Sequence, residues 1–166
     1  MRHLAILLLL AAALLLPRGA ALAAEPHALA VVGFNFVDTS AEAKDQSAAH
    51  AARLAALMQT LEAKLAEGGK LRVVALPCTP APCTADPDID GAVDAARKSG
   101  AEWVLLGSVR KMSTLILEMP VQVIDLASNK TLYGRALSFR GDTDDAWQHA
   151  ARFLARELLA QLPQKP

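Results

Sequence analysis

The spacing of the apolar segments constrains the fold of this chain more than any other feature. Long amphipathic stretches separate the strand-like runs 28–37, 70–76 and 103–111, whereas only short turns separate 103–111, 114–126 and 131–140. Long helical crossovers join parallel strands, and short turns join antiparallel ones. The sequence therefore predicts an α/β (α+β) domain with a single mixed sheet, the order β-α-β-α-β-β-β-α, and helices packed on the sheet.

Three stretches have the apolar repeat of three and four residues that is typical of amphipathic helices. The first covers about 46–67, the second about 89–99, and the third begins at Asp142. Either Asp88 or Asp90 is expected to cap the second helix, because a side-chain oxygen there can accept from a free backbone N–H. Asp142 is interpreted as the start of the last helix, with its charge at the positive end of the helix dipole.

The amino-terminal segment predicts export. An uncharged apolar run covers residues 4–16, and a small-residue site follows at 21–24. A membrane-spanning helix needs about 20 apolar residues, so this run is too short for a permanent anchor. A cleaved signal peptide is therefore expected at residues 1–23, followed by one domain, residues 24–166. No cysteine lies near the cleavage site, which argues against a lipid anchor, and the alanine-rich composition favours a bacterial periplasm.

The charge balance excludes nucleic acid as a partner. Seventeen basic residues face seventeen acidic ones, and loss of Arg2 and Arg18 with the leader leaves a net charge of −2. Phosphate binding uses clustered lysine and arginine, and the chain has no basic block. The mature chain has no second long apolar run, so no membrane anchor is expected after cleavage.

The two cysteines predict a disulfide. Cys78 and Cys83 enclose a short Pro-rich segment, and in an oxidising compartment such an isolated pair is most simply bonded. The small loop limits the stabilisation to about 2–3 kcal/mol. The spacing is not the C-x-x-C of redox enzymes, and a metal site would need further ligands.

An acidic loop is the sharpest candidate for a metal site. Asp86, Asp88 and Asp90 match the opening D-x-D-x-D-G of a calcium loop. The twelfth position, however, is Arg97, where a bidentate glutamate is required. The interpretation is therefore a solvated loop that caps the second helix, and no metal or cofactor is predicted.

Other titratable residues form no catalytic signature. The acidic group Asp142, Asp144 and Asp145 is explained by a helix start. No two histidines have a metal-binding helical spacing. His27 is assigned to a flexible terminus, and the default for the histidines is a solvated surface position: His27, His50 and His149.

Two residues are candidates for a partner surface. Pro120 lies inside the strand-like run 114–126, and proline in a strand indicates an edge or a bulge. This run is therefore expected to form an exposed edge that a partner could use, with Pro120 limiting uncontrolled pairing. Trp147, near the start of the last helix, is the aromatic residue considered for the same role.

Several segments resemble domains with the TolB amino-terminal-domain-like fold. The similarity is carried by 100–109 (GAEWVLLGSV), 30–36 (AVVGFNF) and 123–126 (VIDL). More narrowly, 36–40 and 140–147 resemble an uncharacterised family of exported bacterial proteins. Domains of this fold serve assembly and protein contact in the envelope, so the resemblance implies a role without catalysis.

These observations favour a periplasmic accessory module that contacts another envelope protein. One alternative is a small exported metal-dependent hydrolase that uses the acidic loop together with His149. It requires these groups to converge in one cleft. A second alternative is a periplasmic binder of small molecules, which would need a closed apolar pocket of about 300 Å³ or more.

Overall fold

The computed structural model describes residues 25–78, 83–86 and 88–164. The predicted leader and the whole segment between the cysteines, residues 79–82, lie outside these residues. In chain order the elements are β1 (His27–Val31), β2 (Asn35–Asp38), α2 (Ser47–Glu67), β3 (Leu71–Val74), α3 (Ile89–Lys98), β4 (Trp103–Lys111), β5 (Ile116–Asp125), β6 (Thr131–Arg140) and α4 (Asp144–Gln161).

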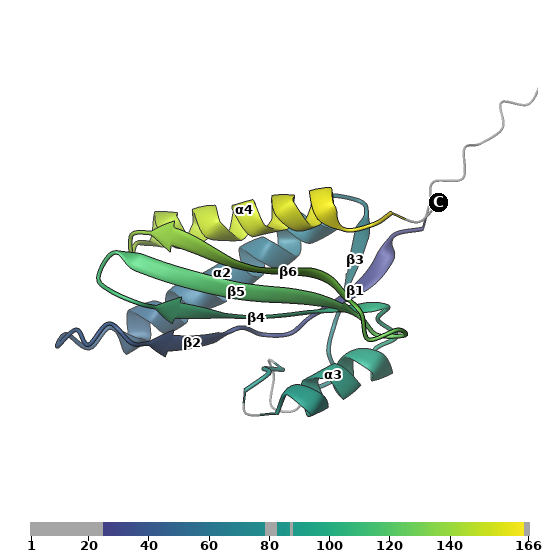
Figure 1. Cartoon of the computed structure of the whole chain (residues 1–166), viewed down its shortest axis with the longest axis horizontal. Helices are drawn as coiled ribbons and strands as arrows, with labels where there is room; N and C mark the ends of the chain where they lie inside the picture. The colour runs from purple at the N-terminus through teal and green to yellow at the C-terminus, as the bar shows by residue number, and fades with distance from the viewer. Residues whose placement is uncertain (1–24, 79–82, 87, 165–166) are drawn as a thin grey trace, which may run out of the picture.

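The strands form one mixed sheet, as the connection lengths predict. The order is β3-β1-β4-β5-β6, and β2 pairs with β4 outside this path. β1 is parallel to β3 and β4, whereas β5 is antiparallel to β4 and β6. Figure 1 shows α2 and α4 on one face of the sheet and α3 on the other. The predicted fold class is therefore confirmed.

The segment 28–37 departs from the prediction of one continuous strand. It forms β1 and β2, which pair with β4 in registers that differ by one residue. Between them, the Gly33 N–H donates to the Cys83 carbonyl at 2.6 Å, and the Phe34 ring lies over Gly107. A Cβ atom at Gly107 would lie 2.5 Å from that ring. The break between β1 and β2 thus places the Phe34 ring in the core at the position where β4 has a glycine and no side chain.

Two apolar cores lie on opposite faces of the sheet. The larger is built by α2, α4 and the strands, and the smaller lies beneath α3. Trp147 is 0% exposed within the larger core. Its assignment to a partner surface is therefore wrong, because α4 turns this side chain onto the sheet.

Pro120 does not mark an edge strand. β5 lies between β4 and β6, and the outer strands of the sheet path are β3 and β6. The β4–β5 ladder is interrupted between the Gly107–Val121 pair and the Arg110–Glu118 pair. Pro120 has no N–H to contribute to this ladder, so it interrupts the pairing inside the sheet. The edge assigned to 114–126 is corrected, whereas Pro120 itself is half-buried on the face opposite α2 and α4.

The residue that caps α3 is one of the two predicted from the sequence, whereas the residue that caps α4 is not the predicted one. The Asp88 side chain accepts from the Gly91 N–H at 2.8 Å and caps α3. Thr143, rather than Asp142, caps α4 by accepting from the Ala146 N–H. Among the described residues, no helix is long and apolar enough to cross a membrane.

Cys78 and Cys83 form the predicted disulfide, and their Cα atoms lie 5.3 Å apart. The bridge follows β3 and ends beside the Gly33 turn, where the Cys83 carbonyl accepts the Gly33 N–H. This hydrogen bond connects the segment after β3 to the segment after β1.

Candidate functional site

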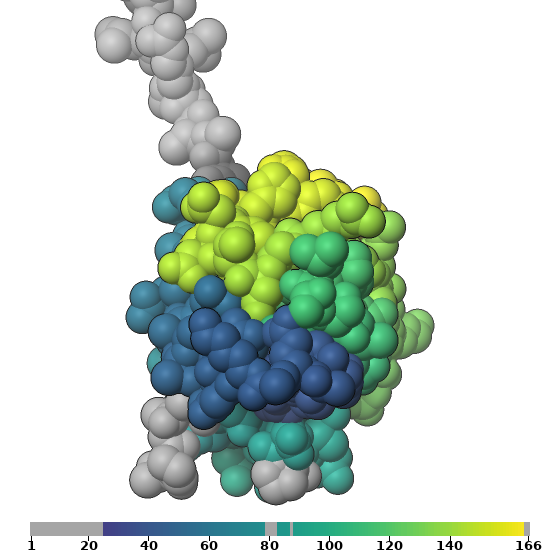
Figure 2. All heavy atoms as spheres, turned by 90° about the vertical axis from the view of Figure 1, so that its left-hand side faces the viewer, coloured from purple at the N-terminus to yellow at the C-terminus, as the bar shows by residue number. Residues whose placement is uncertain are grey.

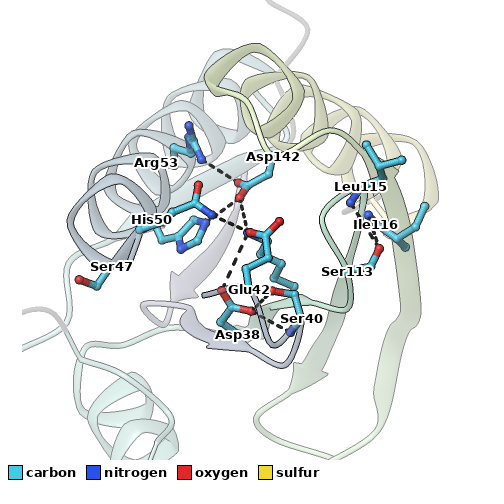
Figure 3. A network of polar contacts seen from close by, with 12 residues as sticks. Asp38, Ser40, Glu42, Ser47, His50, Arg53, Ser113, Leu115, Ile116 and Asp142 are labelled. Carbon is cyan, nitrogen blue, oxygen red and sulfur yellow. Dashed lines mark hydrogen bonds and ion pairs between the residues drawn. The ribbon is translucent and has the colours of Figure 1, made fainter. Parts of the chain in front are cut away.

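Charged side chains from four separate segments meet at one end of the sheet. Figure 2 views this end, where the β2–α2 region (blue) meets the β4–β5 hairpin (green) and the start of α4 (yellow-green). Figure 3 shows Glu42, His50, Arg53 and Asp142 close together at this end. With Lys111, which contacts Glu42 and Asp142, they form the Asp142 cluster: Glu42, His50, Arg53, Lys111 and Asp142.

The Asp142 carboxylate accepts from four donors. Its Oδ1 atom receives Arg53 Nη1 at 2.8 Å and Trp147 Nε1 at 3.1 Å. Its Oδ2 atom receives His50 Nε2 at 2.7 Å and Lys111 Nζ at 2.9 Å. A carboxylate has about four lone-pair sites. Every acceptor site of Asp142 is therefore occupied by a residue of this chain.

The environment keeps Asp142 ionised. Burial raises the pKa of its carboxyl group, but hydrogen bonds from His50, Lys111 and Trp147 outweigh burial and lower that pKa to about 2. These donors favour the charged form because it accepts hydrogen bonds more strongly than the acid. Asp142 is consequently ionised at physiological pH and is a weak proton acceptor.

Lys111, the last residue of β4, is the buried cation of the cluster. It is 1% exposed, and its Nζ atom contacts Glu42 and Asp142. Burial lowers the pKa of the Lys111 ammonium, but the hydrogen bonds to these two carboxylates outweigh burial and hold the pKa above its usual value. The Lys111 carbonyl also accepts the Thr39 N–H at 2.9 Å. Lys111 thereby attaches the β2–α2 segment to the sheet.

His50 is a core residue, which corrects the surface position expected for it. It is 2% exposed, and its ring centroid lies 4.4 Å from that of Phe36 and 6.2 Å from that of Trp147. Because Asp142 is ionised, the Nε2 atom of His50 carries the proton in this hydrogen bond. His27 is also ordered, since it begins β1 and stacks on Trp103. His149 is exposed, as the sequence predicts.

The acidic loop and His149 do not converge. Asp88 and Asp90 lie at the start of α3, whereas His149 lies on α4, and the sheet separates these two helices (Figure 1). Within the described residues, no group of three or more His, Cys, Asp or Glu side chains could hold a metal ion. The two halves of the hydrolase hypothesis therefore lie on opposite faces of the sheet.

A groove of about 620 Å³ lies between α2 and the ends of β1 and β3. Its lining is mainly apolar and includes Leu54, Met58 and Leu76, with the carboxylate of Glu62 among the lining residues. Burial raises the pKa of Glu62. The groove is open to solvent rather than closed, so it differs from the enclosed pocket that the small-molecule alternative requires.

The Asp142 cluster predicts a specific loss of stability in acid. A carboxyl group whose pKa is lowered by folding contributes stability above its unfolded pKa and loses it as pH falls toward the folded value. For Asp142 this window runs from about pH 4 to about pH 2, and the contribution is about 2 kcal/mol. In Asp142→Asn the free energy of unfolding should change less with pH across this window, as measured by urea titration.

The matched control is Asp145→Asn, an exposed aspartate at the start of α4. This variant should keep the acid dependence of the wild type. Equal slopes for the wild type and Asp142→Asn would show that the hydrogen bonds to Asp142 do not favour its ionised form.

Comparison with solved structures identifies the fold. A PelC dodecamer from Paraburkholderia phytofirmans is 16% identical, with a TM-score of 0.51 over 86% of this chain and 92% of that chain. The hypothetical protein CT253 from Chlamydia trachomatis is 14% identical, with a TM-score of 0.52 over 81% and 94%. The LpoB C-terminal domain from Escherichia coli is 18% identical, with a TM-score of 0.50 over 73% and 87%. At these identities the chains share a fold.

The family follows from the sequence comparison. Comparison with curated proteins gives no significant match. A family model, DUF3280, matches residues 27–159, a range that includes the whole Asp142 cluster and all six strands. The membership of an uncharacterised family predicted from the sequence is confirmed. The chain belongs to the DUF3280 family, which is described as "Protein of unknown function (DUF2380)".

Proposed function

We propose that this protein is an exported, non-enzymatic binding module that contacts another protein of the bacterial envelope in the periplasm. The observation that carries the proposal is an uncovered half of the sheet. Along 118–122 of β5 and 134–140 of β6, the residues that point away from α2 and α4 lie outside both apolar cores and are exposed or half-buried. We call this surface the helix-free face: Glu118, Pro120, Gln122, Gly134, Ala136, Ser138 and Arg140.

The helix-free face is suited to contact with a second protein. α3 packs over Val104, Leu106 and Ile124, at the other end of the same side of the sheet. Small residues such as Ala136 and Ser138 leave the strand backbone accessible. Antiparallel sheets often have one face in water, but the small residues of this face also allow a partner to approach the strands closely.

We propose a non-enzymatic role because the two central charged groups of the Asp142 cluster, Asp142 and Lys111, are already fully paired. Asp142 has no free acceptor site, and Lys111 is held as an ammonium by two carboxylates. A general base or nucleophile needs an accessible lone pair. The PelC structure of the same fold is described as a dodecamer, which supports a role in protein contact.

The test is a crosslinking pull-down from periplasm with the full chain, expressed with its own leader and a carboxyl-terminal tag. Intact mass should give a chain that starts at Ala24. We expect saturable capture of one envelope protein, identified by mass spectrometry. Ala136→Glu, on the helix-free face, should abolish capture, because a partner there would bury the new charge unpaired.

The matched control is Ala63→Glu, which places the same charge on an exposed position of α2. It should leave capture unchanged. No saturable partner for the wild type, or equal loss in both variants, would contradict the proposed function. In that case the groove between α2 and β3 becomes the next site to examine, by thermal shift with small apolar amines.

A further inference from the structure

The free edge of the sheet at β6 combines two features that recognise an extended chain. β6 is the last strand of the sheet path, and within the described part of the chain it pairs only with β5. An antiparallel edge strand directs the N–H and C=O groups of every second residue outward, so they can pair with an added strand. α4 runs alongside this edge in Figure 1.

A groove of about 560 Å³ follows this edge between β6 and α4. Leu137, Phe139 and Phe153 provide its apolar surface, and Ala146 and Ala150 keep the α4 side shallow. The β6 part of the groove runs over residues 135–140, a length of about 20 Å for an extended strand. The groove is therefore long enough for a segment of about six residues.

The titratable residues that line this groove are basic. They are Arg135, Arg140 and His149, and no carboxylate is among the lining residues. Arg135 is paired with Glu157 at 2.9 Å. The guanidinium of Arg140 has no hydrogen-bond or ion-pair partner among the described residues, and this side chain belongs to the helix-free face. The free charge along the edge is thus positive.

We propose that the β6 edge binds an extended segment of a partner protein, added as a further strand, in which apolar residues alternate with carboxylates. Apolar side chains of the segment pack into the groove against Phe139 and Phe153. The alternate side chains lie on the helix-free face, where a carboxylate pairs with Arg140. This inference rests on the proposed function and names the chemistry of the partner.

β6 is favoured over the opposite edge strand. β3 has four residues, whereas β6 has ten and therefore offers more outward backbone groups. The groove beside β3 contains the carboxylate of Glu62, which would repel an acidic segment. Charge and length together select the β6 edge.

The test uses a capped seven-residue peptide in which valine and glutamate alternate. It is added at millimolar concentration to the isotope-labelled full mature chain, and amide shifts are followed by NMR. We expect shifts concentrated in β6 and α4, with slower hydrogen exchange of the outward β6 amides. Arg140→Glu should weaken binding roughly ten- to hundredfold, through loss of a charge-assisted hydrogen bond and added repulsion.

Four controls define the result. Arg72→Glu changes an exposed arginine on β3 and should bind the peptide as the wild type does. A peptide with lysine in place of glutamate, and one with alternate amides N-methylated, should both fail to bind. Thermal unfolding should show that Arg140→Glu remains folded.

Absence of binding, binding that tolerates the lysine peptide, or shifts at β3 would each overturn the inference. Protection of the β6 amides in the free protein, with a doubled mass in ultracentrifugation, would place a second copy on this edge and would also overturn it. If the periplasmic partner is captured equally by wild type and Arg140→Glu, the proposed function stands and the β6 inference fails.

Discussion

Replacement of Asp142 by alanine is expected to lower the free energy of unfolding by about 3–5 kcal/mol. The substitution leaves Lys111, which is 1% exposed, as a buried cation with one fewer carboxylate. It also leaves the Nε1–H of Trp147 and the Nε2 of His50 without their acceptor. Removing one member of a buried pair costs more than the pair contributes, because the remaining charge stays away from water.

Urea unfolding measures this effect, and Asp144→Ala is the matched control. Asp144 also pairs with Arg53, but its side chain is 86% exposed, so its removal should cost less than about 1 kcal/mol. A second variant, Lys111→Met in the Asp142→Ala background, should recover part of the loss, because it removes the uncompensated charge. Equal small losses at Asp142 and Asp144, with no recovery in the double variant, would contradict the role of Asp142 as the centre of the cluster.

The topology could be predicted because it depends on local patterns and connection lengths. The strands 103–111 and 131–140 were predicted with the bounds that the structure gives, and β4 and β6 occupy them. The split of 28–37 could not be predicted, since it depends on Phe34 packing over Gly107, far along the chain. Whether β5 is an inner or an edge strand depends on the order of all the strands in the sheet, so Pro120 alone could not indicate it.

The Asp142 cluster left a partial signal in the sequence. In β4, the side chain of Lys111 points to the same face of the strand as those of Leu105 and Val109, which belong to the larger core. A lysine therefore occurs where an apolar residue is expected. His50 precedes Leu54 by four residues and so continues the buried stripe of α2. The pattern therefore indicates two buried polar residues.

The partner of these two residues could not be read from the same patterns. His50 and Asp142 are 92 positions apart, and only the packed fold brings them together. The helix dipole is a sufficient local explanation for Asp142 beside a helix start, so the sequence alone does not indicate its role in the cluster.

Replacement of Trp147 by alanine is expected to cost about 3–5 kcal/mol of unfolding free energy and to lower the melting temperature by roughly 10–20 °C. The side chain is 0% exposed and packs against Phe36 and Phe139, so its removal leaves a large cavity in the main core. The same change removes the indole N–H that donates to Asp142. Thermal denaturation followed by circular dichroism measures both contributions together.

Trp147→Phe separates the two contributions and also tests the original surface assignment. Phenylalanine keeps most of the apolar contact but cannot donate to Asp142, so the cost should fall to about 2 kcal/mol, the loss of one hydrogen bond to a charged group. The variant should capture the periplasmic partner as the wild type does, because the side chain at position 147 is buried between α4 and the sheet. Loss of capture by a folded Trp147→Phe protein would instead show that the indole reaches the partner, through an opening of α4 away from the sheet.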